Sequence, residues 1–511
     1  MTIQPVQPDH CLDPWCMDVD VLIIGAGPTG LGAATRLQQH GHRDWLLVDA
    51  RQGPGGLSQS EETAEGFLFD MGGHVIFSHY AYFDQLLDHA VGSSACCWKT
   101  HQRVSYVWIK DRWVPYPFQN NLFCLPVEDK ISCIHGIIDA KQLNESEKSK
   151  PSNFEEWILR VMGRGIADLF MLPYNFKVWA CQPRTMQCGW LGERVATVDL
   201  KRVVENVILE KPDAGWGPNA TFRFPSHGGT GGVWERVASL LQEERMLFSR
   251  ELIGIDLSTK TASFSDGSVC KFNRMVSTAP LDVTLKWAGR EDLAADLRYS
   301  STHVVGIGLR GLNPHDKKCW MYFPEDNCPF YRCTVFSLYS ENNCPASSRR
   351  IPTIRLADGS APKSTEPQEG PYWSLMFEVS ESAEKPVNLA SIVEDTVRGA
   401  INTKLIRGSH EIVSIFHKRL ERGYPTPSLS RDRAVVEGLK FLKRHGVWSR
   451  GRFGAWKYEV GNQDHSLMQG VEAVDNILFG TMETTLECPD LVNVRRNEDL
   501  QFFVNKGGSV S

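Results

Sequence analysis

The chain has 511 residues, of which 42% are hydrophobic, so it can bury more than one core, and its length favours about two to four domains. Lys and Arg number 55 against 61 Asp and Glu, and the net charge of −6 creates no field that would attract nucleic acid or an anionic membrane. We therefore expect neither of these partners.

The sequence also bears on the compartment. Residues 1–20 are polar and acidic and lack the basic and apolar segments of a signal peptide. No stretch offers the roughly 18 uncharged apolar residues of a membrane span. The fourteen cysteines include no CxxC pair, and the histidines are scattered without an HExxH motif. We expect a cytoplasmic protein with reduced thiols, no membrane association and no metal.

The first chemical signal is a glycine-rich turn that follows an apolar strand over residues 21–24. Gly25 permits a tight corner, Gly27 lets the backbone approach a pyrophosphate, and Gly30 lets the next helix pack on the strand. A second apolar strand delivers Asp49 nineteen residues after Gly30, where a carboxylate suits the hydroxyls of an adenosine ribose. Glycine-rich loops also arise without ligands, but the flanking strand, helix and acid favour dinucleotide binding.

Two further glycine-rich segments come next in the chain. Residues 53–58 form a flexible turn beneath the predicted dinucleotide site, and Gly72 and Gly73 precede His74. The glycine pair suits either a hairpin turn or close contact between the backbone and a ligand. Its position after a strand near the cofactor turn favours the ligand.

Residues of about 119–210 are mostly helical by pattern and suggest an inserted helical domain. Ser152 or Asn153 can cap a helix that runs to about residue 162. Residues 228–232 form another glycine-rich turn, which suits either a second nucleotide site or a simple helix start. No strand that ends in an acid follows at Rossmann spacing, and the two interpretations remain open.

The second half of the chain alternates short strands with turns. Asp266 and Gly267 predict a hairpin, and a β-rich region continues to about residue 424. Residues 462–466 open a predicted helix that ends near residue 477, and its positive end could face an electron-rich ring. The first and last elements of one domain would then lie far apart in the sequence.

Aromatic and amide residues gather in short segments at 116–121, 173–179, 320–322, 423–425 and 456–458. Flat rings cover the faces of sugars or stack on nucleobases, and amides exchange hydrogen bonds with hydroxyls. A single Trp or Tyr is more often a core residue, so only the whole set favours a sugar or nucleotide ligand.

Long segments resemble one family, the eukaryotic and particularly fungal UDP-galactopyranose mutases. The resemblance spans nearly the whole chain and is carried by residues 72–84, 114–121, 168–180, 190–196, 217–232, 322–332, 423–427 and 451–465. Residues 139–152, residues 181–184 and the tail beyond 493 depart from the family pattern, which bears on assembly more than on chemistry.

The resemblance implies an α/β (α+β multidomain) fold with three parts. A discontinuous Rossmann-like FAD-binding domain would comprise residues 1–100, 222–300 and 440–511. A helical domain would comprise 119–205, and a six-stranded antiparallel sheet domain would comprise 101–118, 206–221 and 301–439. Fungal relatives assemble as tetramers, so the resemblance also implies a homo-oligomer.

The implied reaction interconverts UDP-galactopyranose and UDP-galactofuranose, a step of galactofuranose biosynthesis for the cell wall. It involves no net redox change, yet it needs reduced FAD, because nitrogen 5 of the reduced flavin acts as the nucleophile on the anomeric carbon. In fungal relatives NADPH is the reductant. The resemblance places NADPH near His79, Arg103 and Ser105.

The resemblance also assigns the other site residues. His74, Arg194 and Arg332 would be catalytic, with the two arginines holding the departing diphosphate. The substrate would be bound by Tyr116, Phe118, Gln119, Phe170, Asn175, Trp179, Arg194, Asn219, Trp320, Tyr322, Arg332, Tyr424 and Tyr458. FAD would be bound by Gly25, Gly27, Gly30, Asp49, Gly55, Gly56, Leu57, Ser58, Gly73, His74, Arg452, Asn462, Gln463 and Ser466.

Two alternatives remain. An amine-oxidase-like or desaturase-like FAD oxidoreductase would share the glycine turn, Asp49 and the C-terminal helix, but it would have no use for two arginines aimed at a diphosphate. A noncatalytic flavin-binding or UDP-sugar-binding protein would keep the fold without turnover.

Overall fold

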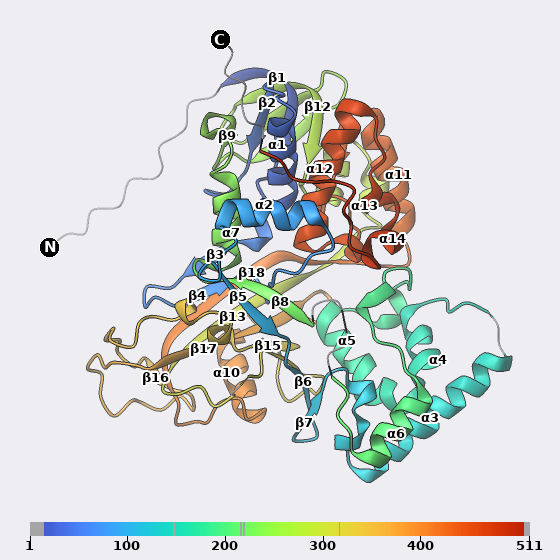
Figure 1. Ribbon diagram of the computed structural model, residues 1–511, viewed down its shortest axis with the longest axis vertical. Helices are drawn as coiled ribbons and strands as arrows, with labels where there is room; N and C mark the ends of the chain where they lie inside the picture. The colour runs from blue at the N-terminus through green and yellow to red at the C-terminus, as the bar shows by residue number, and fades with distance from the viewer. Residues whose placement is uncertain (1–14, 147–148, 215–216, 218–219, 316, 505–511) are drawn as a thin grey trace.

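The computed structural model describes residues 15–146, 149–214, 217, 220–315 and 317–504. Figure 1 shows three parts: a sheet flanked by helices at the top, a second sheet at the lower left, and a group of helices at the lower right. Helices and strands are interspersed along the chain, and the strands form several sheets. This mixed architecture confirms the predicted α/β fold class.

The upper sheet has seven strands in the order β10-β11-β12-β1-β2-β9, and β19 also pairs with β12. Its parallel strands are β1 (Cys16–Ile24), β2 (Trp45–Val48), β9 (Met246–Leu247), β12 (Val269–Ser277) and β19 (Val447–Ser449). The buried apolar runs of β1 and β2 are typical of parallel strands covered on both faces. The sheet thus joins three distant segments of sequence.

The same sheet ends in an antiparallel hairpin. Strand β11 (Thr261–Phe264) pairs with β12 and with β10 (Leu252–Asp256). Gly267 has a φ of +84° in the turn between β11 and β12. The predicted hairpin at Asp266 and Gly267 is therefore confirmed.

Two helices pack closely beside the upper sheet. Helix α1 (Pro28–Gln39) follows the glycine turn, and α12 (Gln463–Phe479) comes from the far end of the chain. A Cβ atom on Gly470 would lie 1.9 Å from the carbonyl oxygen of Thr29, so the two backbones nearly touch. Helix α12 confirms the predicted C-terminal helix, and the contact places its second turn against the first turn of α1.

The lower sheet has eight strands in the order β16-β18-β13-β17-β15-β14-β6-β7. They are β6 (Ser105–Ile109), β7 (Arg112–Pro115), β13 (Arg298–Arg310), β14 (Trp320–Tyr322), β15 (Arg332–Thr334), β16 (Arg355–Leu356), β17 (Tyr372–Glu381) and β18 (Glu411–Thr426). The expectation of six antiparallel strands is wrong in two respects. Short strands extend both edges of the sheet, and β14 pairs with β6 in parallel because β6 comes from a distant segment.

The helical part contains α3 (Val127–Ser146), α4 (Phe154–Ile166), α5 (Leu172–Trp179) and α6 (Leu200–Leu209). The Asn153 side chain accepts a hydrogen bond from the Glu156 backbone at 2.9 Å, which confirms Asn153 as the helix cap. A π-helical turn, η4 (Ala167–Met171), separates α4 from α5. Pro173 follows it, and because proline cannot donate a backbone hydrogen bond, the helix pattern shifts there.

Smaller elements connect the three parts. Strands β3 (Ser60–Glu62) and β4 (Leu68–Asp70) pair with each other, as do β5 (Trp98–Gln102) and β8 (Thr221–Pro225). The remaining helices are α2 (Ala81–Val91), α7 (Gly229–Ala238), α8 (Leu281–Trp287), α9 (Glu291–Ala294), α10 (Ile392–Asn402), α11 (Arg431–Arg444), α13 (Thr484–Glu487) and α14 (Pro489–Asn493). Within the described ranges no helix is both long and apolar enough to cross a membrane.

Candidate functional site

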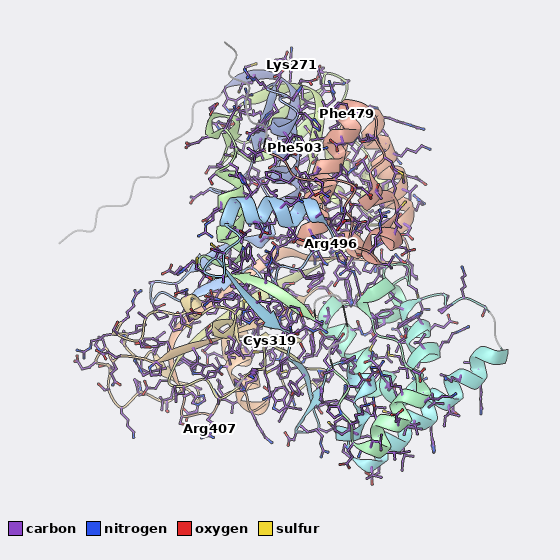
Figure 2. The ribbon with its side chains drawn as sticks, in the orientation of Figure 1. Lys271, Cys319, Arg407, Phe479, Arg496 and Phe503 are labelled. Atoms are coloured by element: carbon purple, nitrogen blue, oxygen red, sulfur yellow. The ribbon has the colours of Figure 1, made fainter. Side chains whose placement is uncertain are left out.

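One continuous cavity of about 1410 Å³ runs between the three parts of the molecule. Gly25, Gly27 and Asp49 line one end, and aromatic residues, including Tyr424 and Tyr458, line the other. Figure 2 shows Cys319, the residue before the lining residue Trp320, near the middle of the molecule, between Lys271 at the top and Arg407 at the bottom. The cavity therefore joins the glycine turn to side chains from distant segments.

The glycine turn is arranged as its spacing predicts. Gly25 has a φ of +97°, and a Cβ atom on Gly30 would lie 1.8 Å from the Gly25 carbonyl oxygen, so both positions exclude a side chain. At Gly27 the situation differs, because the nearest described protein atom to an added Cβ is the Gly56 Cα at 3.8 Å. Gly27 therefore presents bare backbone to the cavity, and this cradle fits a dinucleotide pyrophosphate at the start of α1.

Asp49 lies directly after β2, beside this cradle. Its Oδ2 accepts a hydrogen bond from the Ala26 backbone at 2.6 Å, and its Oδ1 accepts one from the Arg51 backbone at 2.7 Å. Burial raises the pKa of Asp49, while these two backbone bonds and the Arg51 charge oppose the rise. The carboxylate is thus fixed at the cavity wall, where a ribose would meet it.

The second glycine-rich segment packs under the first. Gly55 has a φ of +109° and donates its N–H to the Ala26 carbonyl at 2.9 Å. Gly56, Leu57 and Ser58 line the cavity from this turn.

Gly72 and Gly73 do not form a hairpin, because β4 ends at Asp70 and pairs only with β3 among the described strands. A Cβ atom on Gly73 would lie 3.2 Å from Arg332 Nη2 and from Trp320 Nε1. The two glycines therefore let the backbone approach side chains of the cavity, which settles the open question against a hairpin.

His74 follows this pair and is held neutral. Burial lowers the pKa of His74 to about 4, and the charges of Arg452 and Arg332 act in the same direction, whereas Glu378 opposes them. The His74 Nδ1 atom is buried and has no hydrogen-bond partner among the described residues. A buried polar atom beside the cavity fits a bound polar group such as a flavin ring.

The two predicted catalytic arginines reach the same cavity from different parts. Arg332, on β15, donates from Nε and Nη2 to Glu378 at 2.5 and 2.8 Å. Arg194 lies in the short 3-10 helix η6 (Gly192–Arg194), with its guanidinium 4.8 Å from the centre of the Tyr458 ring. It donates to the Glu459 carbonyl at 2.9 Å. Both side chains line the cavity, as do Arg103 and Arg452.

Aromatic rings from the helical part and the lower sheet meet at this end. The ring centres of Tyr116 and Tyr322 lie 5.1 Å apart, and Trp179 lies 4.8 Å from Tyr458 and 5.5 Å from Tyr424. Gln119 donates to the Ala196 carbonyl at 2.5 Å, while its own Oε1 is buried without a partner among the described residues. The Gln119 Oε1 and Trp320 Nε1 atoms have no hydrogen-bond partner among the described residues. Aromatic rings with such polar atoms beside them suit a nucleobase and a sugar.

Most predicted site residues come together here. The cavity is lined by Gly25, Gly27, Asp49, Gly56, Leu57, Ser58, Gly73, His74, Arg103, Tyr116, Gln119, Phe170, Asn175, Trp179, Arg194, Trp320, Tyr322, Arg332, Tyr424, Arg452, Tyr458, Asn462, Gln463 and Ser466. Gly30, Gly55, Phe118 and Ser105 are outside the lining, and Phe118 is fully buried, with its ring centre 4.8 Å from that of Phe170. Asn219 lies outside the described residues.

His79, one of the predicted NADPH residues, is also outside the lining. Its backbone N–H and its Nδ1 atom lie 3.0 and 2.8 Å from Asp464 Oδ2. Together with His465, these side chains form a buried group of possible metal ligands. The bonds to His79 use Asp464 Oδ2, and His465 Nδ1 lies 3.3 Å from Asp464 Oδ1.

Sequence reasoning missed several residues of the cavity wall, among them Tyr174, Tyr331 and Glu378. Tyr174 and Tyr331 lie inside segments that were recognised but were not chosen among several aromatic neighbours. Glu378 has a clearer signal, since it is an acid within the buried run of β17, whereas the other acid, Glu381, ends the strand at a half-buried position. A buried charge in such a strand requires a charged partner.

Comparisons with known proteins agree with this geometry. Residues 28–308 match the sequence model of the family described as flavin containing amine oxidoreductase. A putrescine oxidase bound to putrescine has 13% identity and a TM-score of 0.59, with 91% of this chain and 99% of that chain covered. A fatty acid isomerase from P. acnes has 12% identity and a TM-score of 0.55, with 90% and 99% covered. These two likenesses concern the fold alone.

Fold, glycine turn and cavity therefore define the class of flavin-containing amine oxidoreductases. Within it, a reduced UDP-galactopyranose mutase has 45% identity and a TM-score of 0.87, with 95% of this chain and 99% of that chain covered. The chain belongs to the UDP-galactopyranose mutase family.

Proposed function

We propose that this protein is an FAD-dependent isomerase that interconverts UDP-galactopyranose and UDP-galactofuranose. The observation that carries the proposal is that Arg194 and Arg332 line the same cavity as the glycine turn and His74. When bound and reduced, FAD supplies the electron pair of its nitrogen 5 for attack on the anomeric carbon. The tasks left to the protein are to hold the nucleotide sugar, to stabilise the departing diphosphate and to exclude water.

The two arginines are suited to the diphosphate. Guanidinium groups bind phosphate oxygens through paired hydrogen bonds, and they stabilise charge that develops on a leaving group. In Arg332, the described hydrogen bonds use Nε and Nη2 and leave Nη1 for a ligand. Tyr322 and Tyr424 stand near, and burial raises the pKa of both phenols, so they stay protonated and can donate to the same oxygens.

His74 has a different task. With its pKa lowered to about 4, the imidazole is neutral at physiological pH and offers no charge to a neighbouring ring. A neutral imidazole can accept or donate one hydrogen bond, which suits a group whose protonation changes on reduction.

The mutase proposal rests on the protein family and on the arginines of the cavity. An amine-oxidase-like or desaturase-like enzyme would share the flavin-binding fold but would not need these arginines. Several arginines line the cavity, among them Arg103, Arg194, Arg332 and Arg452, and they disfavour an amine cation as the substrate. They favour an anionic nucleotide sugar.

Four finer features belong to the same proposal. We propose that the protein is of the fungal type, with NADPH as the reductant near Arg103 and Ser105. Arg103 lies on the cavity wall with its guanidinium 5.4 Å from the Tyr116 ring centre. We also propose a cytoplasmic homo-tetramer, which the exposed Ile208 and Leu209 on α6 support. Sedimentation of the purified protein tests the tetramer, and a monomeric species alone would contradict it.

Substitution of Arg332 tests the function. We expect Arg332→Ala to reduce turnover of UDP-galactofuranose by the reduced enzyme by about 10²- to 10³-fold, because a donor to the leaving charge is lost. Flavin content should stay unchanged. Arg310 provides a matched control, since it is ion-paired with Glu411 in the same sheet but lies outside the cavity lining. Equal turnover in the Arg332→Ala and Arg310→Ala variants would contradict the assigned role.

A further inference from the structure

Glu378 lies on the cavity wall and carries a carboxylate, although it is only 3% exposed. Arg332 on β15 and Glu378 on β17 are directly opposite in the antiparallel register, so their side chains share one face of the sheet. The carboxylate accepts two hydrogen bonds from Arg332 and a third from the Gly73 backbone at 2.6 Å. It therefore joins two segments that are far apart in the sequence.

The charge on this carboxylate is well supported. Burial pushes the pKa of Glu378 upward, but the charge and hydrogen bonds of Arg332, the Gly73 N–H and His74 outweigh burial, and the pKa is lowered. A buried ion pair of this kind is strongly disturbed when one partner is removed. Glu378 is thus ionised opposite Arg332.

A single oxygen atom makes the connection. Oε1 accepts from both Arg332 Nη2 and the Gly73 N–H. Gly72 has a φ of +136°, and a Cβ atom there would lie 3.1 Å from the same Oε1. The turn that carries His74 is therefore bent onto the carboxylate, and the spacing between the Arg332 guanidinium and this turn is set by Glu378.

We propose that Glu378 is a positioning residue for the reaction, which holds the diphosphate arginine in register with the turn beside the flavin. The role rests on the proposed function, because it places Arg332 at the diphosphate and His74 at the cofactor. With the arginine fixed, the leaving group is held at a defined distance from the attacked carbon. Glu378 also compensates the Arg332 charge before substrate arrives, so diphosphate attraction in the ground state is moderated.

This role predicts that binding and turnover respond differently. In Glu378→Gln, an amide NH2 replaces the oxygen that accepts from Arg332 Nε, so one of the two Arg332 hydrogen bonds is lost and the Arg332 charge is left uncompensated. UDP should bind at least as tightly as in the wild type, because the free cation attracts the diphosphate. The kcat should fall by about 10²-fold, because misplacement by roughly 1 Å is enough for such a loss.

The structure offers a matched control in the pair formed by Arg450 and Glu483. It has the same two hydrogen-bond lengths, 2.5 and 2.8 Å, and both side chains are buried, but neither residue lines the cavity. Glu483→Gln should lower the melting temperature and leave kcat unchanged. It measures what the loss of a buried pair does to stability alone.

The experiment compares kcat, the Kd of UDP, flavin content and melting temperature in the wild type, Glu378→Gln, Glu378→Asp and Glu483→Gln. Glu378→Asp keeps the charge but is too short to reach both partners, so its kcat should fall about tenfold or more, and it serves if Glu378→Gln does not fold. Unchanged kcat in the Glu378 variants would overturn the positioning role. A parallel loss of UDP affinity, kcat and stability would also overturn it, since a merely structural residue behaves in that way. An inactive wild type would instead overturn the proposed function, and this role with it.

Discussion

Two glycine-rich turns lead into helices that touch each other, α1 and α7, yet among the described residues only the turn before α1 lines the cavity. At the start of α1, Gly27 faces open space and Asp49 stands beside it. At the start of α7, the Thr230 N–H donates to Asp70 at 3.2 Å, and the Thr230 hydroxyl donates to the same carboxylate at 3.0 Å. A helix start is a ligand site only where no side chain of the protein already occupies it.

The glycines of the second turn have a packing role instead. A Cβ atom on Gly229 would lie 2.4 Å from Asp70 Oδ1, and one on Gly231 would lie 2.4 Å from the Ser60 backbone nitrogen. The turn therefore lets α7 approach β3 and β4. Of the two interpretations open from sequence, this arrangement supports the simple helix start over a second nucleotide.

The largest expected effect is a loss of FAD affinity in Gly27→Ala, which is compared with the effect of Gly30→Ala. Gly27→Ala should weaken FAD binding by about 10- to 100-fold, because its methyl group would occupy the space of the pyrophosphate. The φ of −75° at Gly27 suits alanine, so the melting temperature of the flavin-free protein should not change. Gly30→Ala is the contrast, since its Cβ would collide with the Gly25 carbonyl and destabilise the flavin-free protein as well. Full flavin content in Gly27→Ala would contradict the claim that the Gly27 backbone faces the pyrophosphate.

A smaller effect is expected at the second turn. Asp70→Ala leaves the Thr230 N–H and the Ser60 hydroxyl without their buried acceptor, and the Thr230 hydroxyl keeps only the Ser58 carbonyl. The free energy of unfolding should fall by about 2 kcal/mol, and the Kd of UDP should stay the same. Denaturant unfolding of the flavin-bound protein measures the first quantity. If the free energy of unfolding of Asp70→Ala equalled that of the wild type, Asp70 would not stabilise the start of α7.

A further expected effect is a dependence of stability on pH. Burial raises the pKa of Asp70 to about 7, against the opposing hydrogen bonds from Ser60 and Thr230. The folded state then holds this proton more strongly than the unfolded state, whose pKa is near 4, so stability falls as pH rises from 4 to 7. The slope from one such group is at most about 1.4 kcal/mol per pH unit.

Asp70→Asn removes this contribution. Glu472, whose pKa burial raises to about 8, has the same sign and persists in the variant. The stability of the wild type should therefore fall relative to that of Asp70→Asn over this pH range. Parallel curves for the two proteins would contradict the raised pKa.

Local spacing made much of the fold predictable. The strand at residues 21–24, the glycine turn, the Asn153 cap and the hairpin at Gly267 each depend on neighbours within a few residues, and the structure confirms them. The same holds for the backbone at the cofactor end of the cavity. The domain boundaries, with 119–205 for the helical domain, stay predictions.

The other end of the cavity depends on distant partners. Arg332 and Glu378 are 46 residues apart, and Glu378 and Gly73 are 305 apart. Their contact follows from the register of β15 and β17 and from the path of the turn, neither of which a single sequence specifies. Family resemblance supplied the arginines, but not the acid that holds one of them.

The most direct measurement of the central claim compares the reduced and oxidised forms of the same preparation. Each form, with flavin content verified, is incubated with UDP-galactofuranose, and the products are separated. The account predicts conversion to UDP-galactopyranose by the reduced form and none by the oxidised form. Equal conversion by both forms would contradict the role of the reduced flavin, and inactivity of both would favour a protein that binds flavin or UDP-sugar without turnover.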